Sequence, residues 1–377
     1  MSMSSQTERW LLETVYGNRQ DICSQLGRAL LMLLSYVYRA AIFLYLLPFR
    51  IGVRKKKRLP CPVISVGNLT VGGTGKTPAV RLVCDELIRM GYNPAVLSYG
   101  YGGRLGGRFG VVSDGKQIFL SALEVGDEPV MLAKQMPGVA VLVGKDRCMT
   151  GTVAIRDYGA DIIVLDDGLQ VWKLDRDLDI VLVDVDSPFD NGRCLPAGRL
   201  RQPPSVLKEA GCIVITGGLF QRREQDYQPA VTKIRRVASD APLFFSGYQT
   251  TVITTLGDGT VLSEQDLRDK RVFVVSSIAR PERFEHTVER IGAIIVGKRF
   301  FRDHHLYEPS DIQKACAEAT EAGAQYIVTT EKDQVKINPE IATMPILVIC
   351  VRMFLGDETA FRGILEEKVR AASLKTT

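Results

Sequence analysis

The residues best suited to phosphate chemistry follow a short apolar run at residues 63–66. A glycine-rich segment comes next and ends in Lys76 and Thr77, and a helical pattern begins after Pro78. Glycines let the backbone turn until its N–H groups face a phosphate, while the lysine can reach phosphate oxygens and the threonine hydroxyl can bind Mg²⁺. This order predicts a P-loop that binds a nucleoside triphosphate, although Thr70 stands where the usual pattern has its first glycine. The predicted nucleotide-binding residues are Thr70, Val71, Gly72, Gly73, Thr74, Gly75, Lys76 and Thr77.

Carboxylates stand at two places where they could serve this site. Asp166 and Asp167 follow the apolar run 162–165, and acids at the carboxyl end of a strand beside a P-loop can hold Mg²⁺ or its waters. Asp127 and Glu128 open a helical pattern, where a carboxylate could orient an acceptor hydroxyl and take its proton. The alternatives are a solvated strand end for the first pair and a helix N-cap for the second.

Two of the three histidines, His304 and His305, are adjacent in a loop of the second half of the chain. Either could pair with a carboxylate across a cleft and tune its basicity, or both could be surface residues. The third, His286, lies in an amphipathic helical pattern and is expected to be structural. Residues 329–333 follow an apolar run, and we expect them either to cap a helix or to face the cleft.

Two loops have the composition expected of an acceptor-binding surface. Residues 98–104 are rich in glycine and tyrosine, and residues 191–202 contain three arginines whose guanidinium groups could clamp phosphate oxygens. The candidate substrate-binding residues are Asn68, Tyr101, Arg104, Gln170, Arg199 and Arg201.

The composition indicates a globular chain with a charge that is unevenly placed. The 377 residues are 46% hydrophobic and 24% charged, which is long enough and apolar enough for two domains. Eight cysteines show neither C-x-x-C nor metal-ligand spacing, which favours reduced thiols in the cytosol. Residues 1–58 contain ten basic and three acidic residues, a net charge of +7 that leaves −2 for the remainder. The body therefore offers no basic surface for nucleic acid.

Residues 26–49 are long and apolar enough to cross a membrane as a helix. Arg39 interrupts them, at a cost of about 2.5–3.5 kcal/mol at the bilayer centre, and Arg28, Ser35 and Arg39 share one narrow helical stripe. The helix could instead lie in the membrane surface or pack on the body of the protein. The basic cluster 54–58 suits anionic headgroups and places the rest of the chain on the cytoplasmic side.

Short apolar runs alternate with helical patterns along the rest of the chain, which predicts parallel strands buried on both faces. The expected fold is α/β: a P-loop NTPase-like, mostly parallel sheet, a second, smaller α/β domain and an N-terminal membrane-associated helix. The expected division is 1–58 for the helix and basic cluster, 59–235 for the P-loop kinase domain and 236–377 for the smaller domain. The expected strands include residues 63–66, 95–98, 139–143, 162–165, 180–183, 212–215, 243–245, 272–275, 294–296, 326–328 and 346–350.

In their order along the chain, these motifs resemble those of tetraacyldisaccharide 4'-kinases, the lipid A 4'-kinases of Gram-negative bacteria. The resemblance extends from about residue 60 to 335, and the N-terminal helix fits it as well. The matching segments are 67–78, 100–103, 125–129, 166–170, 195–198, 303–304 and 330–333.

The resemblance implies a kinase that uses ATP and Mg²⁺ to phosphorylate the 4'-hydroxyl of a tetraacyldisaccharide 1-phosphate at the cytoplasmic face of the inner membrane. The product is the bis-phosphorylated lipid A precursor, lipid IVA. Asp127 is implied to activate the acceptor hydroxyl, with His304 as its partner and Lys76 as the P-loop lysine. The implied partners are the lipid acceptor and inner-membrane lipids, and we expect a monomer that binds no nucleic acid. The implied metal-binding residues are Thr77, Glu128, Asp166 and Asp167.

Two departures from the family pattern concern the loops. Tyr99 replaces the arginine of Ser-Arg-Gly-Tyr-Gly-Gly, and residues 199–202 are Arg-Leu-Arg-Gln in place of Pro-Leu-Arg-Glu. We expect both to affect acceptor recognition and to leave the nucleotide site untouched. The rival interpretation is a membrane-associated P-loop ATPase switch without a lipid acceptor, but Val71 stands where many such ATPases have a second lysine. A GTPase would need N/T-K-x-D, and residues 331–333 lack its spacer.

Overall fold

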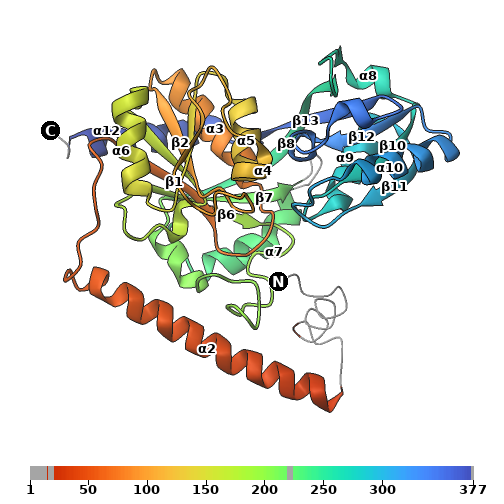
Figure 1. The fold of residues 1–377 in the computed structure, drawn as a ribbon. Helices are drawn as coiled ribbons and strands as arrows, with labels where there is room; N and C mark the ends of the chain where they lie inside the picture. The colour runs from red at the N-terminus through yellow and green to blue at the C-terminus, as the bar shows by residue number, and fades with distance from the viewer. Residues whose placement is uncertain (1–14, 16–20, 219–223, 375–377) are drawn as a thin grey trace.

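The computed structural model describes residues 15, 21–218 and 224–374. Within these residues one 13-stranded sheet runs through the whole body, helices cover it, and the long helix α2 (Ile22–Arg50) lies outside it (Figure 1). The strands are β1 (Val63–Asn68), β2 (Pro94–Ser98), β3 (Gly110–Ser113), β4 (Ala140–Val143), β5 (Ile162–Asp166), β6 (Leu178–Asp184), β7 (Cys212–Gly218), β8 (Leu243–Thr255), β9 (Val261–Leu262), β10 (Arg271–Ser276), β11 (Ile294–Phe300), β12 (Tyr326–Thr330) and β13 (Ile346–Leu355).

The remaining α-helices connect strands or cover the faces of the sheet. They are α3 (Lys76–Arg89), α4 (Ala122–Val125), α5 (Asp127–Gln135), α6 (Arg147–Tyr158), α7 (Glu224–Arg235), α8 (Glu264–Leu267), α9 (Pro281–Ile291), α10 (Pro309–Glu321), α11 (Glu331–Gln334) and α12 (Glu358–Ser373). Short 3₁₀ turns lie at η1 (Gly168–Gln170), η2 (Pro204–Glu209) and η3 (Pro339–Ile341).

The mostly parallel α/β sheet is confirmed. Its order is β11-β10-β12-β13-β8-β7-β6-β1-β5-β2-β4-β3, with β9 paired to β8. β1 is central and pairs in parallel with β5 and β6, and its six residues are all buried, as the unbroken apolar run predicts. Every strand expected from the sequence is present, whereas β3 and β9 are short antiparallel additions that no long apolar run marks.

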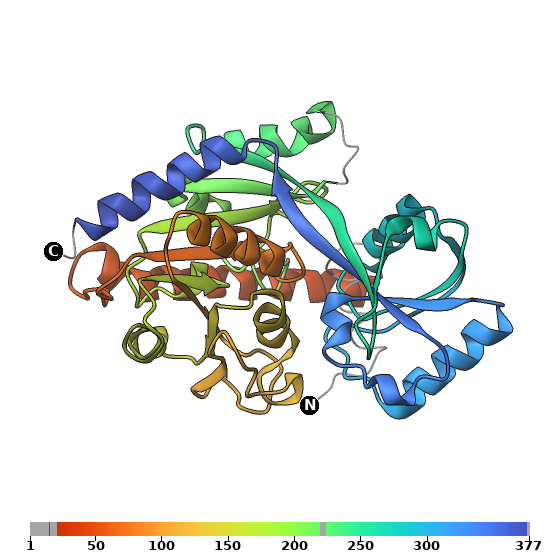
Figure 2. The same ribbon diagram turned by 90° about the horizontal axis from the view of Figure 1, so that it is seen from above.

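The sheet passes from the P-loop lobe into a second lobe without a break. The long strands β8 and β13 pair antiparallel and extend from one lobe to the other (Figure 2). The last helix, α12, then returns to the first lobe, where Phe361 and Leu365 belong to the same buried cluster as Ile64 and Val80. The division of the chain at 235/236 remains a prediction.

Helix α2 spans the predicted apolar stretch and exposes most of it. It begins after Asp21, whose carboxylate accepts the Ser24 N–H at 3.0 Å as an N-cap. It is long and apolar enough to cross a membrane, and only 6% of its most apolar window is buried. Ser35 is buried on the side facing the body, whereas Leu30 and Leu44 are more than half exposed. The helix could therefore anchor the protein to a membrane through its outward face.

Candidate active site

The P-loop joins β1 to α3 in the middle of the sheet. Gly75 has a left-handed φ of +83° and ends the loop, so that α3 begins at Lys76 and its first N–H groups point into the loop. Thr77 is buried in the first turn, and Gly72 has a φ of +113°. Backbone donors at a helix N-terminus, together with a lysine, form a site for phosphate oxygens.

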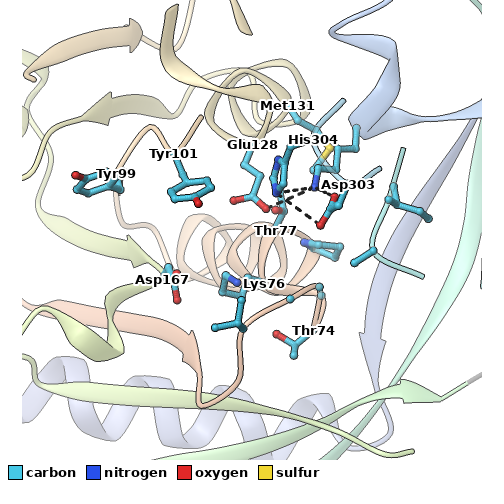
Figure 3. Close-up of a pocket in the computed structure, with 18 of the residues that line it drawn as sticks. Thr74, Lys76, Thr77, Tyr99, Tyr101, Glu128, Met131, Asp167, Asp303 and His304 are labelled. Carbon is cyan, nitrogen blue, oxygen red and sulfur yellow. Dashed lines mark hydrogen bonds and ion pairs between the residues drawn. The ribbon is translucent and has the colours of Figure 1, made fainter. Parts of the chain in front are cut away.

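The P-loop opens into a cavity of about 1510 Å³ between the two lobes. Residues from α5, α6 and the loops after β2 and β5 line one part, and residues from α9, the loop after β11 and α11 line another. Figure 3 shows Lys76, Thr77, Glu128 and His304 gathered around this space. This volume exceeds the roughly 300–1,000 Å³ of ordinary ligand pockets, so the cavity has room for more than one small ligand.

Asp127, at the start of α5, and His304, in the loop after β11, meet at the edge of the cavity, which His304 lines. Asp127 is the first residue of α5 and is only 4% exposed, and Nδ1 of His304 lies 2.9 Å from its Oδ1 and 3.1 Å from its Oδ2. His305 instead contacts Asp311, at 2.8 Å through Nε2. Of the two adjacent histidines, His304 is therefore the one that the fold brings to the acid.

Two residues of the site have left-handed backbones that non-glycine residues rarely adopt. The φ of His304 is +61° and that of Asp167 is +55°. Each such conformation costs on the order of 1–3 kcal/mol, and these outliers cluster at functional sites. Their strain is evidence that both side chains are held where they are by the surrounding structure.

Two lysines beside Asp127 were not among the predicted site residues. Lys336 Nζ lies 3.2 Å from Asp127 Oδ2 and 3.1 Å from Asp333 Oδ1, and its side chain is 1% exposed. Lys332 Nζ lies 2.8 Å from Asp303 Oδ1 and 3.3 Å from His304 Nε2. Lys332 was in the segment 329–333 whose role the sequence left open, whereas Lys336 follows it without any motif of its own.

Both expectations for residues 329–333 are met at once. The hydroxyl of Thr330 accepts the Asp333 N–H as the N-cap of α11, and Lys332, two residues after Thr330, lines the cavity. Asp333 is fully buried and accepts from the Ser277 N–H at 3.1 Å. The cap thus holds the lysine in the cleft.

The pairing of Asp127 with His304 shifts both ionisations. Burial favours the neutral form of Asp127, but the hydrogen bond from His304 and the charges of Lys332 and Lys336 outweigh it and hold the pKa of this carboxyl well below its usual range. The hydrogen bond to Asp127 raises the pKa of the His304 imidazole against its burial and the charge of Lys332. A proton on Nδ1 of His304 is thereby held against a charged carboxylate.

The acids after β5 lie beside the P-loop, as predicted. Asp166 accepts from the Ser98 hydroxyl at 2.8 Å, and Asp167 accepts from Arg201 Nη1 at 2.6 Å. Among the described residues, Oδ1 of each aspartate is buried without a hydrogen-bond partner. Burial, with the charges of Glu128 and Asp167 adding to it, raises the pKa of Asp166 to about 7.

These groups fit a hard cation that also binds phosphate. Mg²⁺ takes oxygen ligands, keeps several waters and is usually held by one or two carboxylates plus phosphates. The described residues contain no cluster of three or more His, Cys, Asp or Glu that would hold a metal by itself. The unpartnered oxygens of Asp166 and Asp167 and the hydroxyl of Thr77 are suited to such a shared site, with Glu128 close by.

The candidate acceptor residues separate into three groups. Tyr101, Gln170 and Arg201 line the cavity, and the Tyr101 ring centroid lies 6.2 Å from that of His304. Arg104 is exposed and does not line the cavity. Asn68 is fully buried behind the P-loop and donates to the Thr70 carbonyl at 2.8 Å, so its observed contact shapes the loop.

Of the two departures from the family pattern, Tyr99 lies in the cavity, whereas residues 199–202 lie partly against the P-loop. Tyr99 lines the cavity and faces Arg147, whose guanidinium carbon lies 5.9 Å from the ring centroid. Gln202 is buried behind Gln170, whose amide donates to its Oε1 at 3.1 Å. Arg199, however, donates from Nε to the Val71 carbonyl at 3.0 Å. The expectation that these changes leave the nucleotide site untouched is therefore wrong for Arg199.

Arg147 is a further residue that the sequence did not single out. It begins α6, lines the cavity and is 4% exposed, and it donates from Nη1 to the Gly144 carbonyl. Burial lowers the pKa of its guanidinium to about 10, although the charges of Asp166 and Asp167 oppose this shift. No local sequence pattern marks Arg147 as a site residue, because Asp166 and Asp167 become its neighbours only in the folded chain.

Comparisons with known proteins indicate the family of this chain. A family model described as Tetraacyldisaccharide-1-P 4'-kinase matches residues 27–370. The tetraacyldisaccharide 4'-kinase of Syntrophus aciditrophicus (strain SB) is 41% identical over 349 residues, covering 90% of this chain and 93% of the relative. That of Geobacter metallireducens is 39% identical over 342 residues, covering 89% and 98%.

A solved structure shares the whole fold. The "apo" form of LpxK from Aquifex aeolicus, crystallised in complex with ATP, is similar with a TM-score of 0.73 and 27% sequence identity. The match covers 91% of this chain and 99% of that chain. Because the family model and these relatives extend over nearly the entire sequence, the chain belongs to the tetraacyldisaccharide 4'-kinase family.

Proposed function

We propose that this chain is an ATP-dependent lipid kinase. It transfers the γ-phosphate of ATP to the 4'-hydroxyl of a tetraacyldisaccharide 1-phosphate and forms the bis-phosphorylated lipid A precursor. The single observation that supports this best is the hydrogen bond between buried Asp127 and His304, because His304 lines the same cavity as the P-loop lysine Lys76. An ATPase switch also needs a P-loop, but it does not require a buried acid–imidazole pair, whereas a kinase can use such a pair to activate an acceptor hydroxyl.

Asp127 is proposed to orient the acceptor hydroxyl and accept its proton. The new bond joins the 4'-oxygen to the γ-phosphorus while the bond to the β–γ bridging oxygen breaks, and ADP leaves. Asp127 alone, with its lowered pKa, is a weak base. Its hydrogen bond to His304 and its ion pair with Lys336 place the carboxylate and balance its charge as the proton moves.

Lys76 is proposed to stabilise charge on the transferred phosphoryl group from the start of α3. Thr77, Glu128, Asp166 and Asp167 would hold Mg²⁺, which when bound neutralises charge on the β and γ oxygens. Arg201 is proposed to position Asp167, because its Nη1 donates to Asp167 Oδ2 at 2.6 Å and also to Gln170 Oε1 at 3.2 Å. The side chains Tyr101 and Tyr99 are proposed to contact the disaccharide.

The proposed location is the cytoplasmic face of the inner membrane. Leu30 and Leu44, on the outward side of α2, would enter the acyl region, and the basic cluster 54–58 would face anionic headgroups. An acceptor with four acyl chains stays in the bilayer, so anchoring the enzyme to the same membrane raises the effective concentration of the acceptor at its active site. All the groups of the proposed mechanism come from one chain, which is consistent with a monomer bound to inner-membrane lipids.

The decisive test follows labelled γ-phosphate from ATP into a tetraacyldisaccharide 1-phosphate in mixed micelles. The native protein is expected to label the lipid only with Mg²⁺, and Lys76→Ala is expected to abolish labelling. Lys233→Ala, an exposed lysine on α7, is the control and should label the lipid normally. ATP hydrolysis without labelled lipid would refute the kinase and support the ATPase switch.

A further inference from the structure

The loop that precedes η2 runs beside the P-loop. The Val71 N–H donates to the Arg199 carbonyl at 2.8 Å, and the Arg201 N–H donates to the Leu69 carbonyl at 2.7 Å. Thr70 and Leu200 lie opposite one another as an antiparallel bridge. The P-loop is therefore supported along its outer edge by a second backbone, and residue 199 lies at the point where the phosphate-binding turn begins.

The side chain of Arg199 reinforces this contact. Its Nε donates to the Val71 carbonyl at 3.0 Å, so residues 71 and 199 are joined by two hydrogen bonds of opposite direction. Its Nη2 lies directly against Gly72, where an added Cβ would overlap it. Gly72 also has a left-handed φ of +113°, so the backbone and the guanidinium fit only because this residue is glycine.

Within the part of the chain that the structure describes, no carboxylate balances the charge of Arg199. Among the described residues no acid forms an ion pair with it, whereas Arg201 pairs with Asp167 at 2.6 Å and Arg280 with Asp184 at 3.0 Å. An arginine beside a P-loop raises the local positive potential at the place where phosphates bind. Its backbone contact also holds the Val71 and Gly72 peptides in the turn.

We propose that Arg199 is a positioning residue for the nucleotide phosphates in this chain. It fixes the start of the P-loop turn through Val71 and Gly72 and adds a cation beside it, and so strengthens ATP binding before any acceptor arrives. This inference rests on the proposed function only for its nucleotide, ATP.

The test measures ATP binding to the full-length protein without any lipid acceptor. Displacement of a fluorescent ATP analogue should show ATP bound about tenfold more weakly by Arg199→Ala, since hydrogen bonds to charged groups are worth roughly that much. Arg199→Lys keeps the charge but loses the Nε donor to Val71, so its affinity for ATP should lie between those of the native protein and Arg199→Ala. Arg236→Ala removes an exposed arginine elsewhere and should bind ATP as the native protein does.

Steady-state kinetics separate positioning from general damage. Arg199→Ala should raise KM for ATP about tenfold while kcat and KM for the lipid stay within twofold. Unchanged ATP affinity in Arg199→Ala would overturn the inference, and so would equal losses in ATP and lipid KM with a lowered Tm of the nucleotide-free protein. If the native protein labels no lipid, the proposed function fails, but the binding experiment still decides the role of Arg199.

Discussion

Nδ1 of His304 lies 2.9 Å from Oδ1 of Asp127, although the two residues are 177 positions apart in the chain. The acid begins α5 in the P-loop lobe, and the histidine lies in the loop after β11 in the second lobe. The proposed acceptor-activating group is therefore complete only when the two lobes are in contact. Substitution of either residue is therefore expected to impair the proposed activation of the acceptor hydroxyl.

Asp127→Asn should retain ATP binding and lower turnover by roughly 10²–10⁴-fold, the usual size of a general-base contribution. The amide keeps the shape of the side chain but cannot accept the hydroxyl proton. Phosphate transfer to lipid under saturating ATP measures the effect, and Asp157→Asn, on the surface at the end of α6, serves as the matched control. Near-normal turnover in Asp127→Asn would remove this residue from the mechanism.

The stability that His304 contributes should depend on pH. Its folded pKa is raised chiefly by the hydrogen bond to Asp127, so its contribution is fully present below the unfolded value of about 6.5 and is lost as pH rises through the folded pKa. Urea unfolding of the native protein and of His304→Gln, from pH 5 to pH 9, measures this difference. The gap in free energy of unfolding should narrow with rising pH; a gap that widens contradicts the raised pKa.

Gly103→Ala should destabilise the turn that presents Asp127. An added Cβ would lie 2.5 Å from the Val125 Cα and 2.6 Å from the Gly126 nitrogen, and backbone atoms cannot move aside as a flexible side chain can. We expect the free energy of unfolding to fall by about 1–3 kcal/mol and kcat to fall with it. Gly363→Ala, in α12 with open space around it, should raise stability by up to about 1 kcal/mol. Similar unfolding midpoints for the two variants would show that residues 103 and 125–126 are not packed this closely.

Removal of residues 1–50 should abolish binding to neutral phosphatidylcholine vesicles, since it removes the apolar face of α2. The cut spares the contacts of Arg58 with Asp175 and Asp177, both at 3.0 Å, and so preserves the entry into β1. Binding to anionic vesicles should persist weakly through residues 54–58 and disappear at high salt. If the full-length protein did not bind neutral vesicles, α2 would not be the membrane anchor.

Linear patterns predicted the parts of the molecule that a single segment determines. The buried strands, the P-loop and the acids after β5 each occupy one stretch of sequence, and the structure places them together as expected. His304 was also found this way, because the short motif 303–304 marks it. Lys336 and Arg147 were missed because their neighbours, Asp127 and Asp166, come from distant segments and no local pattern identifies them.

The expectation that Arg199 leaves the nucleotide site untouched was wrong for the same reason, because its contact with the P-loop joins distant segments of the chain. A loop of changed composition gave no indication of which face of the P-loop it would touch, and only the pairing of residues 70 and 200 brings it there. Asn68 likewise has the type of a ligand-binding residue, yet it is buried and bonded to Thr70. Residue type predicts what a side chain can do, and the packing of the fold determines which partner it meets.

The loop that touches the P-loop also holds α2. The hydroxyl of Ser35 donates to the Cys194 carbonyl at 2.8 Å, and that of Tyr38 donates to the Arg201 carbonyl at 3.1 Å. The segment 194–201 thus contacts both α2 and the P-loop. If α2 lies in lipid as proposed, this loop would hold the P-loop at a fixed distance from the membrane surface, so the depth of α2 would determine the height of the proposed nucleotide site.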